Sequence, residues 1–367
     1  MKRTERNTYL WQLLATLLLL VTTGMFSACS SDDTNTTPND VNDAEIRFNP
    51  SVWQVLEGTR ATFYDTGASL ASGSFICYAF NANSTTPYIN QTTVNYTAGQ
   101  WTFEDGKHYW PADGSLDFFA YMPKEESKPS YITSGPTYSV SGTPQATFTC
   151  SSMPMSYDAS SPTAGQGNSL QEFVWGITVG QNKENQGASG VTMKFCHPFA
   201  RIRFQLSASH PNIQINSITF KNLKTGGTCI LNATNVEETY YYKTSVWSSL
   251  TPAEGGSNFV MTLASKDNDG NYVAADVNTF NDNPTNVVPI GGYSGGAHQY
   301  VDLLMVPQTF GGEVVVNATW TDWGDQLPHN VTASVPTPWQ AGYSYTYTFT
   351  ITETDLIVDT TKFTEQW

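Results

Sequence analysis

The chain has 367 residues, of which 39% are hydrophobic and 13% aromatic, enough for packed cores in two domains of ordinary size. Only 13% are charged, against roughly a quarter in an average soluble domain, so Ser, Thr, Asn, Gln, Gly and Tyr must cover much of the surface, as in extracellular β-proteins. The net charge of −15 argues against nucleic acid as a partner.

Residues 1–28 have the layout of a secretory signal peptide. A basic lead with Arg3 and Arg6 precedes the apolar run at 13–21, which is far shorter than the roughly 20 residues that span a membrane. Small residues then stand directly before Cys29 and resemble a bacterial lipobox. We therefore expect a palmitate-bearing lipoprotein, anchored through Cys29 in the outer membrane; the alternative is a plain secreted protein with an incidental cysteine.

Residues 29–44 form a predicted flexible, acidic tether. The stretch has one large apolar residue, Val41, and many Asp, Asn and Thr. The acidic residues Asp32 and Asp33, just behind Cys29, resemble the surface-export signal of Bacteroidales lipoproteins. A solvated tether explains them equally well.

The stretch Glu45–Phe63 predicts a β-strand that ends at an exposed cutting site. Its apolar positions are Ile46, Phe48, Trp53 and Val55. Turn chemistry at Gly58–Ala61 then ends the pattern, and an arginine-specific protease would find one accessible bond, Arg60–Ala61, because Arg47 lies inside the apolar pattern. Cutting there would free the first strand and uncover the apolar surface beneath it.

Beyond Arg60 the chain predicts short strands separated by turns, which is typical of an all-β sandwich. Apolar strands are expected at 75–80, 94–96 and 116–121, and no window has helical periodicity. The Ser-, Thr-, Pro- and Gly-rich stretch 136–168 is interpreted as a long loop, and 181–190 as a linker between domains.

Aromatic motifs in this half resemble the fimbrillin family of Bacteroidales, the subunits of type V pili. They are TRAT at 59–62, WTF at 101–103, YWPADG at 109–114 and LDFFAYMP at 116–123. The resemblance implies two tandem transthyretin-like β-sandwich domains, at 45–185 and 186–367, and a role in cell adhesion. It continues in FCHPFARIRF at 195–204 and WQAGY at 339–343.

The second half begins with a predicted strand at 193–206 that is half buried. Ala200, Ile202 and Phe204 face one side, whereas Arg201 and Arg203 face the other. Further strands are expected at 213–220, 259–263, 301–306, 314–320, 331–335 and 343–351.

Three motifs could indicate a catalytic or metal site, and each has a simpler structural interpretation. His197, beside a proline, is interpreted as a packed or hydrogen-bonded residue, and Asp267–Gly270 as a hairpin turn that lacks the remaining ligands of a calcium loop. Gly292–Gly296 matches G-x-S-x-G without the strand-turn-helix that a nucleophile elbow needs. We therefore predict no enzyme, metal or cofactor.

Four cysteines remain after Cys29, namely Cys77, Cys150, Cys196 and Cys229. An exported protein can pair them, in three connectivities. Their apolar contexts fit buried free thiols equally well.

The tail after Ile351 carries further apolar residues, namely Leu356, Val358, Phe363 and Trp367. A globular domain could stop at Ile351, so we expect the tail to need a partner. The hypothesis is donor-strand exchange: the tail of one subunit fills the site that the first strand of the next leaves after cleavage. Head-to-tail repetition gives a homo- or heteropolymer of fimbrial subunits at the cell surface.

The rival hypothesis is a monomeric surface lipoprotein that binds glycans. Trp320 and Trp323, or exposed tyrosines, would then form a sugar platform.

Overall fold

The computed structural model describes most of the chain from Glu45 to Gln366. Within that span it leaves out 53–69, 71–72, 83, 152, 154–155, 159–171, 187–188, 209–212, 238–241, 253–257, 263, 267–271, 277–287, 290, 295–296, 301–302, 310–312, 321–327, 335–337 and 352–355. The described part is nearly all β, which confirms the predicted class. None of its helices is long and apolar enough to cross a bilayer.

Sheet I contains seven described strands. In spatial order they are β1 (Ser51–Val52), β10 (Lys194–Cys196), β9 (Val174–Gln181), β5 (Leu116–Met122), β2 (Ser74–Asn81), β3 (Pro87–Thr97) and β4 (Gln100–Phe103). The pairing of β1 with β10 is parallel, and the other pairs are antiparallel.

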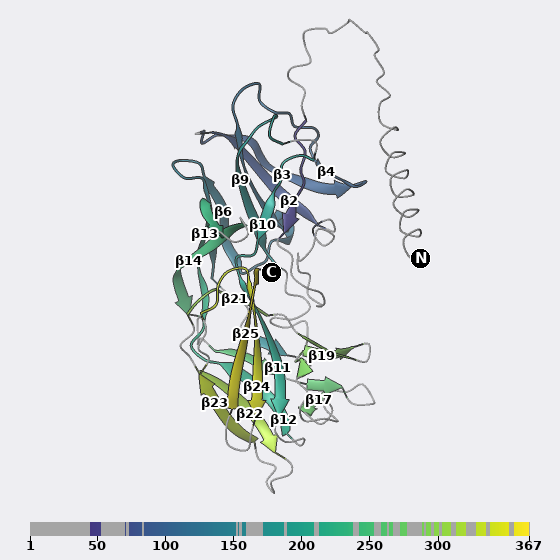
Figure 1. The fold of residues 1–367 in the computed structure, drawn as a ribbon, viewed down its shortest axis with the longest axis vertical. Helices are drawn as coiled ribbons and strands as arrows, with labels where there is room; N and C mark the ends of the chain where they lie inside the picture. Colours follow the sequence, from purple (N-terminus) through teal and green to yellow (C-terminus); the bar gives the residue numbers. More distant parts are fainter. Residues whose placement is uncertain are drawn as a thin grey trace, which may run out of the picture. The chain divides into compact units, whose positions relative to one another are not determined.

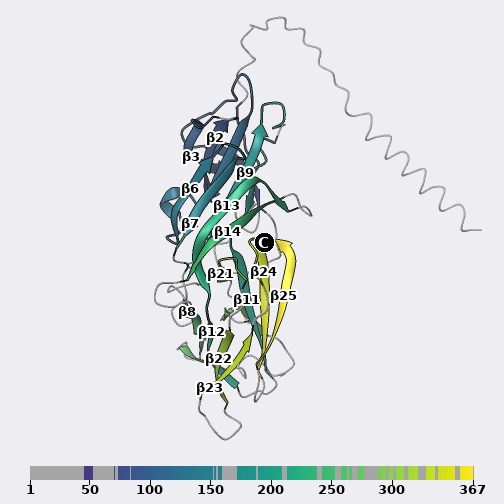
Figure 2. The same cartoon turned by 90° about the vertical axis from the view of Figure 1, so that its left-hand side faces the viewer.

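Sheet II packs on one face of sheet I. Its strands are β14 (Tyr242–Pro252), β13 (Lys224–Glu237), β7 (Gln145–Cys150) and β6 (Ile132–Ser139), which run alongside one another in Figure 2. Between the sheets Phe148 of β7 meets Trp175 of β9 with ring centroids 4.6 Å apart. The predicted loop at 136–168 is therefore wrong in part. The alternation Ala146, Phe148, Cys150 buries one face of β7 although its neighbours are polar.

Sheet I is buried on both faces, and β5 is buried along its whole length. Phe119 and Tyr121 belong to the core shared with sheet II. Phe118 and Ala120 point to a second core on the opposite face.

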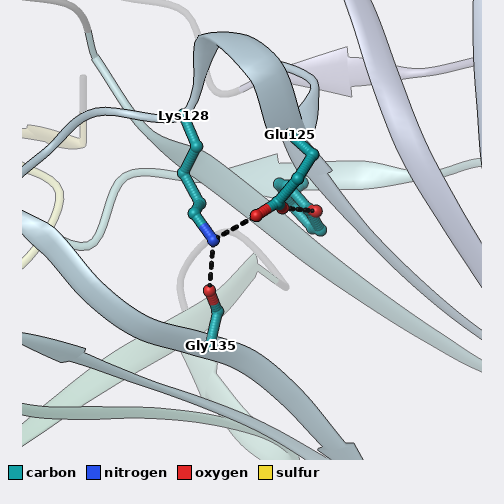
Figure 3. A network of polar contacts seen from close by, with 4 residues as sticks. Glu125, Lys128 and Gly135 are labelled. Carbon is teal, nitrogen blue, oxygen red and sulfur yellow. Dashed lines mark hydrogen bonds and ion pairs between the residues drawn. The ribbon is translucent and has the colours of Figure 1, made fainter.

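The short 3₁₀ helix η1 (Glu125–Ser127) lies between β5 and β6 and is held by Lys128. Lys128 Nζ donates to Glu125 Oε1 at 2.6 Å and to the Gly135 carbonyl at 2.8 Å (Figure 3).

Sheet III contains the end of the chain. Its strands are β18 (Val288–Pro289), β11 (Ala200–Ala208), β24 (Tyr343–Ile351) and β25 (Leu356–Gln366), with β21 (Leu303–Met305) also paired to β11. β11, β24 and β25 lie side by side in both views (Figures 1 and 2). β11 is more buried than predicted, because Arg201 is fully enclosed and Ser344 of the paired strand β24 accepts its Nε hydrogen bond at 3.4 Å.

Sheet IV packs on sheet III. Its strands are β16 (Ala264–Lys266), β17 (Tyr272–Asp276), β12 (Ile213–Phe220), β15 (Phe259–Thr262), β8 (Ser156–Asp158), β22 (Glu313–Trp320) and β23 (Pro328–Ser334). Phe220 of β12 stacks obliquely on Phe204 of β11 at 5.1 Å. A separate hairpin joins β19 (Gly291–Ser294) to β20 (Ala297–Tyr300).

Strand pairing crosses the predicted domain boundary at 185/186. β10 pairs with β9, and β13 pairs with β7, so strands from both sides of the boundary share sheets I and II. The stretch 181–190 accordingly connects two neighbouring strands of sheet I. The two-domain division stays a prediction.

Candidate functional site

Residues 45–52, the front segment, cover the second core of sheet I. Ile46 and Phe48 alternate with the exposed Arg47 and Asn49, and their side chains are only 2% and 6% exposed. The alternation is that of a strand with one face on a core. The burial of Ile46 and Phe48 agrees with the predicted alternation, whereas their displacement stays a prediction.

Phe48 occupies an aromatic box. Its ring meets Phe75, Phe103 and Phe118 at centroid distances of 5.3, 5.4 and 5.6 Å, in edge-to-face contacts. Such contacts add to the free energy of burial, because the positive edge of one ring faces the negative face of another. Phe48 is therefore the main anchor of the front segment.

The front segment is hydrogen-bonded along two sides. On one side, Asn49 N donates to the Val191 carbonyl at 2.9 Å and Ser51 N to the Met193 carbonyl at 2.9 Å. On the other side, Ile46 N donates to the His108 carbonyl at 2.8 Å, and Phe48 forms a β-bridge with Trp101 of β4. Apart from β1, which belongs to the segment itself, β10 and β4 are the opposite ends of sheet I, so the segment closes the gap between the two edges.

Charges at its beginning contribute little. Lys107 Nζ lies 2.9 Å from Glu45 Oε2, and this hydrogen bond and the Glu45 charge raise the pKa of Lys107. The Lys107 side chain is 64% exposed, so solvent screens the pair. The front segment is held by apolar burial and backbone pairing.

The tail pairs with its own chain. β25 forms an antiparallel ladder with β24 from Ile351↔Leu356 to Tyr343↔Gln366, and β24 is its partner in sheet III. The tail therefore has a partner strand within its own chain, and its role as a donor stays a prediction. Ile357 is 50% exposed, and the remaining side chains of this strand lie outside what the structure describes, as does Trp367.

Several predicted site residues lie outside the described part of the chain. They are Cys29, Trp53, Val55, Arg60 and Ala61. Their roles stay predictions.

The motifs set aside in the sequence have structural roles where the structure describes them. His197 Nδ1 lies 2.5 Å from Glu172 Oε1 in a buried hydrogen bond, as expected for a packed or hydrogen-bonded histidine. β16 and β17 flank Asp267–Gly270 as an antiparallel pair, which fits a hairpin, and Gly292–Ser294 belongs to strand β19. Within the described residues no group of three or more His, Cys, Asp or Glu side chains is placed to hold a metal.

All four remaining cysteines are buried, and none of them forms a disulfide in the structure. Burial raises the pKa of Cys77 and of Cys229, so both stay protonated and unreactive at neutral pH. Of the two alternatives left by the sequence, the structure shows buried thiols.

A sequence model of the fimbrillin-like family matches residues 59–367. The chain belongs to the fimbrillin-like family. The matched region begins after the front segment and includes the tail. No curated protein matches this fimbrillin-like chain.

Solved structures similar to this fimbrillin-like protein come from species of Bacteroides, Parabacteroides and Porphyromonas. A proposed cell adhesion protein from Bacteroides ovatus has 13% identity and a TM-score of 0.48, covering 88% of this chain and 97% of the other. A fimbrial assembly protein from Parabacteroides distasonis has 10% identity and a TM-score of 0.38, with 87% and 99% covered. The tip fimbrial protein Mfa3 from Porphyromonas gingivalis, truncated at its C-terminus, has 11% identity and a TM-score of 0.36, with 88% and 100% covered.

The sequence did not indicate the residues that enclose the front segment. Trp101 and Phe103 stood out only as part of a motif, and 181–190 was interpreted as a linker. The alternation of Val191, Met193 and Phe195, all buried, was the available signal for a strand edge beside residues 45–52.

Proposed function

We propose that this protein is a structural subunit of a cell-surface fimbrium that serves adhesion and is not an enzyme. Membership of the fimbrillin-like family supports this role and implies other fimbrial subunits as partners. We further propose export as an outer-membrane lipoprotein through Cys29, and assembly by donor-strand exchange after cleavage at Arg60–Ala61.

The observation that carries the exchange is the position of the front segment between two strand edges over a core. Burial of Ile46 and Phe48 contributes roughly 1.5 to 3 kcal/mol each before entropy costs. The stability of a whole domain is about 5 to 15 kcal/mol. A chain that loses this segment exposes apolar surface and unpaired backbone, and a strand from another subunit can cover both.

Cleavage changes the equilibrium by releasing a tether. Before cleavage the front segment is bound intramolecularly, at a high effective concentration. After a cut at Arg60 it becomes a separate peptide that competes with the tails of other subunits. Because Cys29 and the front segment both precede Arg60, one cut removes the lipid anchor and opens the site together.

The proposed donor is the tail, residues 356–367. As an edge strand, β25 exchanges its ladder with β24 for a ladder in the next subunit, so backbone hydrogen bonds are conserved overall. The net gain comes from covering the core around Phe75 and Phe118.

The test is incubation with an arginine-specific protease, followed by electrophoresis without boiling. We expect a product that begins at Ala61, together with a ladder of oligomers, and neither from an Arg60→Lys variant. An uncut monomer that binds glycans would overturn the proposal in favour of the glycan-binding rival.

A further inference from the structure

The chain offers an arginine-specific protease a second arginine, Arg47, in the middle of the front segment. The Arg47 side chain is exposed, so its charge alone does not protect it. A protease must also draw the substrate backbone into an extended, unpaired conformation and place the scissile carbonyl in an oxyanion hole. Protection of the Arg47–Phe48 bond must therefore come from the backbone.

The connection between β9 and β10 binds that backbone. Val191 N donates to the Arg47 carbonyl at 2.7 Å, which occupies the oxygen that a protease would need. The side chain of Gln186 contacts both sides of Ile46: its Nε2 donates to the Glu45 carbonyl at 3.4 Å, and its Oε1 accepts from Arg47 N at 3.5 Å.

Gly190 makes this close approach possible. Its φ is +87°, in the left-handed region, and a Cβ at this position would lie 2.5 Å from both the carbonyl carbon and the oxygen of Arg47. Those two atoms are backbone and cannot rotate away as a side chain would. Any other residue at position 190 must push the Arg47 carbonyl off the sheet edge.

The connection is itself rigid on its β9 side. Asn182 and Asn185 exchange side-chain-to-backbone hydrogen bonds at 2.8 and 2.9 Å, and Asn185 Nδ2 donates to the Gly180 carbonyl at 3.0 Å. Gln186 follows directly and is held in place by this turn.

We propose that Gln186, Gly190 and Val191 form a clasp that closes the Arg47–Phe48 bond to proteolysis and so determines which arginine is cut. The clasp keeps the front segment whole until the bond after Arg60 is broken. This inference rests on the proposed processing by an arginine-specific protease. It assigns a specificity-determining role to the connection between β9 and β10.

The experiment compares full-length chains that all carry Arg60→Lys, so that cleavage after Arg47 is measured alone. Each is incubated with an arginine-specific protease, and the fraction of chains that begin at Phe48 is followed by N-terminal sequencing. With the clasp intact we expect almost none. Adding Gly190→Ala should raise the rate of this cut by about tenfold or more, because the opened state becomes more populated.

Gly142→Ala is the matched control. Gly142 also has a left-handed φ, +77°, but a Cβ there would meet nothing within 4 Å, so the substitution brings backbone strain without the collision. It should leave the cut at Arg47 unchanged. Equal cleavage in the two glycine variants, or no cleavage in a folded Gly190→Ala chain, overturns the clasp.

Cleavage at the fully buried Arg201 reports global unfolding in any variant. If the Gly190→Ala chain is cut at Arg201 and is therefore unfolded, the Gln186→Ala variant replaces it in the test. Gln186→Ala removes the two side-chain contacts without backbone strain. A selective rise at Arg47 then supports the clasp, and no rise contradicts it. The presence or absence of a product beginning at Ala61 in the unmodified chain tests the processing site separately.

Discussion

Phe48 illustrates how one side chain fixes the position of a strand. Three rings surround it edge-on, and it is buried although both sequence neighbours are exposed. The cavity left by removing the Phe48 ring could not collapse easily, because several rigid rings form its walls. Phe48 therefore anchors the front segment in the core on this face of sheet I.

Replacing Phe48 by alanine should lower the free energy of unfolding by about 3 to 5 kcal/mol, because burial and ring contacts are both lost. Urea denaturation of the uncleaved chain measures the change. The neighbouring Asn49→Ala variant, at an exposed position, should stay within about 0.5 kcal/mol of the unmodified chain. A loss below about 1 kcal/mol for Phe48→Ala would contradict its role as anchor.

Glu125 gives the fold a pH dependence. Burial by itself raises the pKa of Glu125, but hydrogen bonds from Lys128 and Tyr121 and the charge of Lys128 outweigh it, so the pKa lies below its ordinary 4.5. A carboxyl group with a lowered pKa stabilises the fold above its unfolded-state pKa. This stability is lost as the pH falls through the folded-state pKa.

Lys128→Gln removes the strongest of these interactions, so the free energy of unfolding should fall less steeply as the pH drops below the ordinary Glu pKa of 4.5 than in the unmodified chain. Chemical denaturation across this range measures the slope. Lys124→Gln is the control, because Lys124 lies 3.8 Å from the exposed Glu126 and should leave the slope unchanged. Identical slopes for all three chains would exclude the Glu125 network as the cause.

At the scale of the element, the proposed exchange of the front segment rests on contacts that are those of a generic strand. Its backbone pairs with β10 and bridges to β4, and only alternate side chains enter the core. Any extended segment with apolar residues two positions apart can reproduce this pattern, whereas a longer, two-sided buried strand such as β5 cannot be replaced in this way.

A synthetic peptide of residues 44–60, added in excess to the protease-treated chain, should therefore slow the formation of oligomers. It competes with the tail for the vacated site. The same peptide with Phe48→Ala should compete less well, because it lacks the anchor of the aromatic box. Equal inhibition by both peptides, followed by electrophoresis without boiling, would show that the site does not select for the Phe48 side chain.

Local patterns in the sequence predicted the strands themselves better than they predicted which strands pair with one another. The alternation of Tyr343 to Ile351 and the apolar run Leu116 to Tyr121 gave β24 and β5 because periodicity is a property of the strand itself. The pairing of β25 with β24, and of residues 45–49 with the segment before β10, depends on contacts distant in sequence. The periodicity of one segment does not specify which distant segment it pairs with. For the same reason β13 and β14 were not anticipated beside β7.

At the scale of the whole molecule, both elements needed for exchange are occupied in the monomer. The front segment closes sheet I, and β25 lies on β24 at the edge of sheet III. In this state the front segment and β25 are both paired within the chain, so polymerisation would add no strand pairing. Under the proposed exchange, assembly requires an outside event, and that event is the loss of the front segment.

The most direct measurement mixes two forms of the chain that can each perform only half of the exchange. An accept-only form ends at Ile351 and has been cleaved after Arg60, and a donate-only form carries Arg60→Lys and keeps both its front segment and its tail. Size-exclusion chromatography with light scattering should find monomers in each separate sample and a one-to-one complex in the mixture. Monomers alone in the mixture, with cleavage complete and the front segment gone, would contradict the exchange.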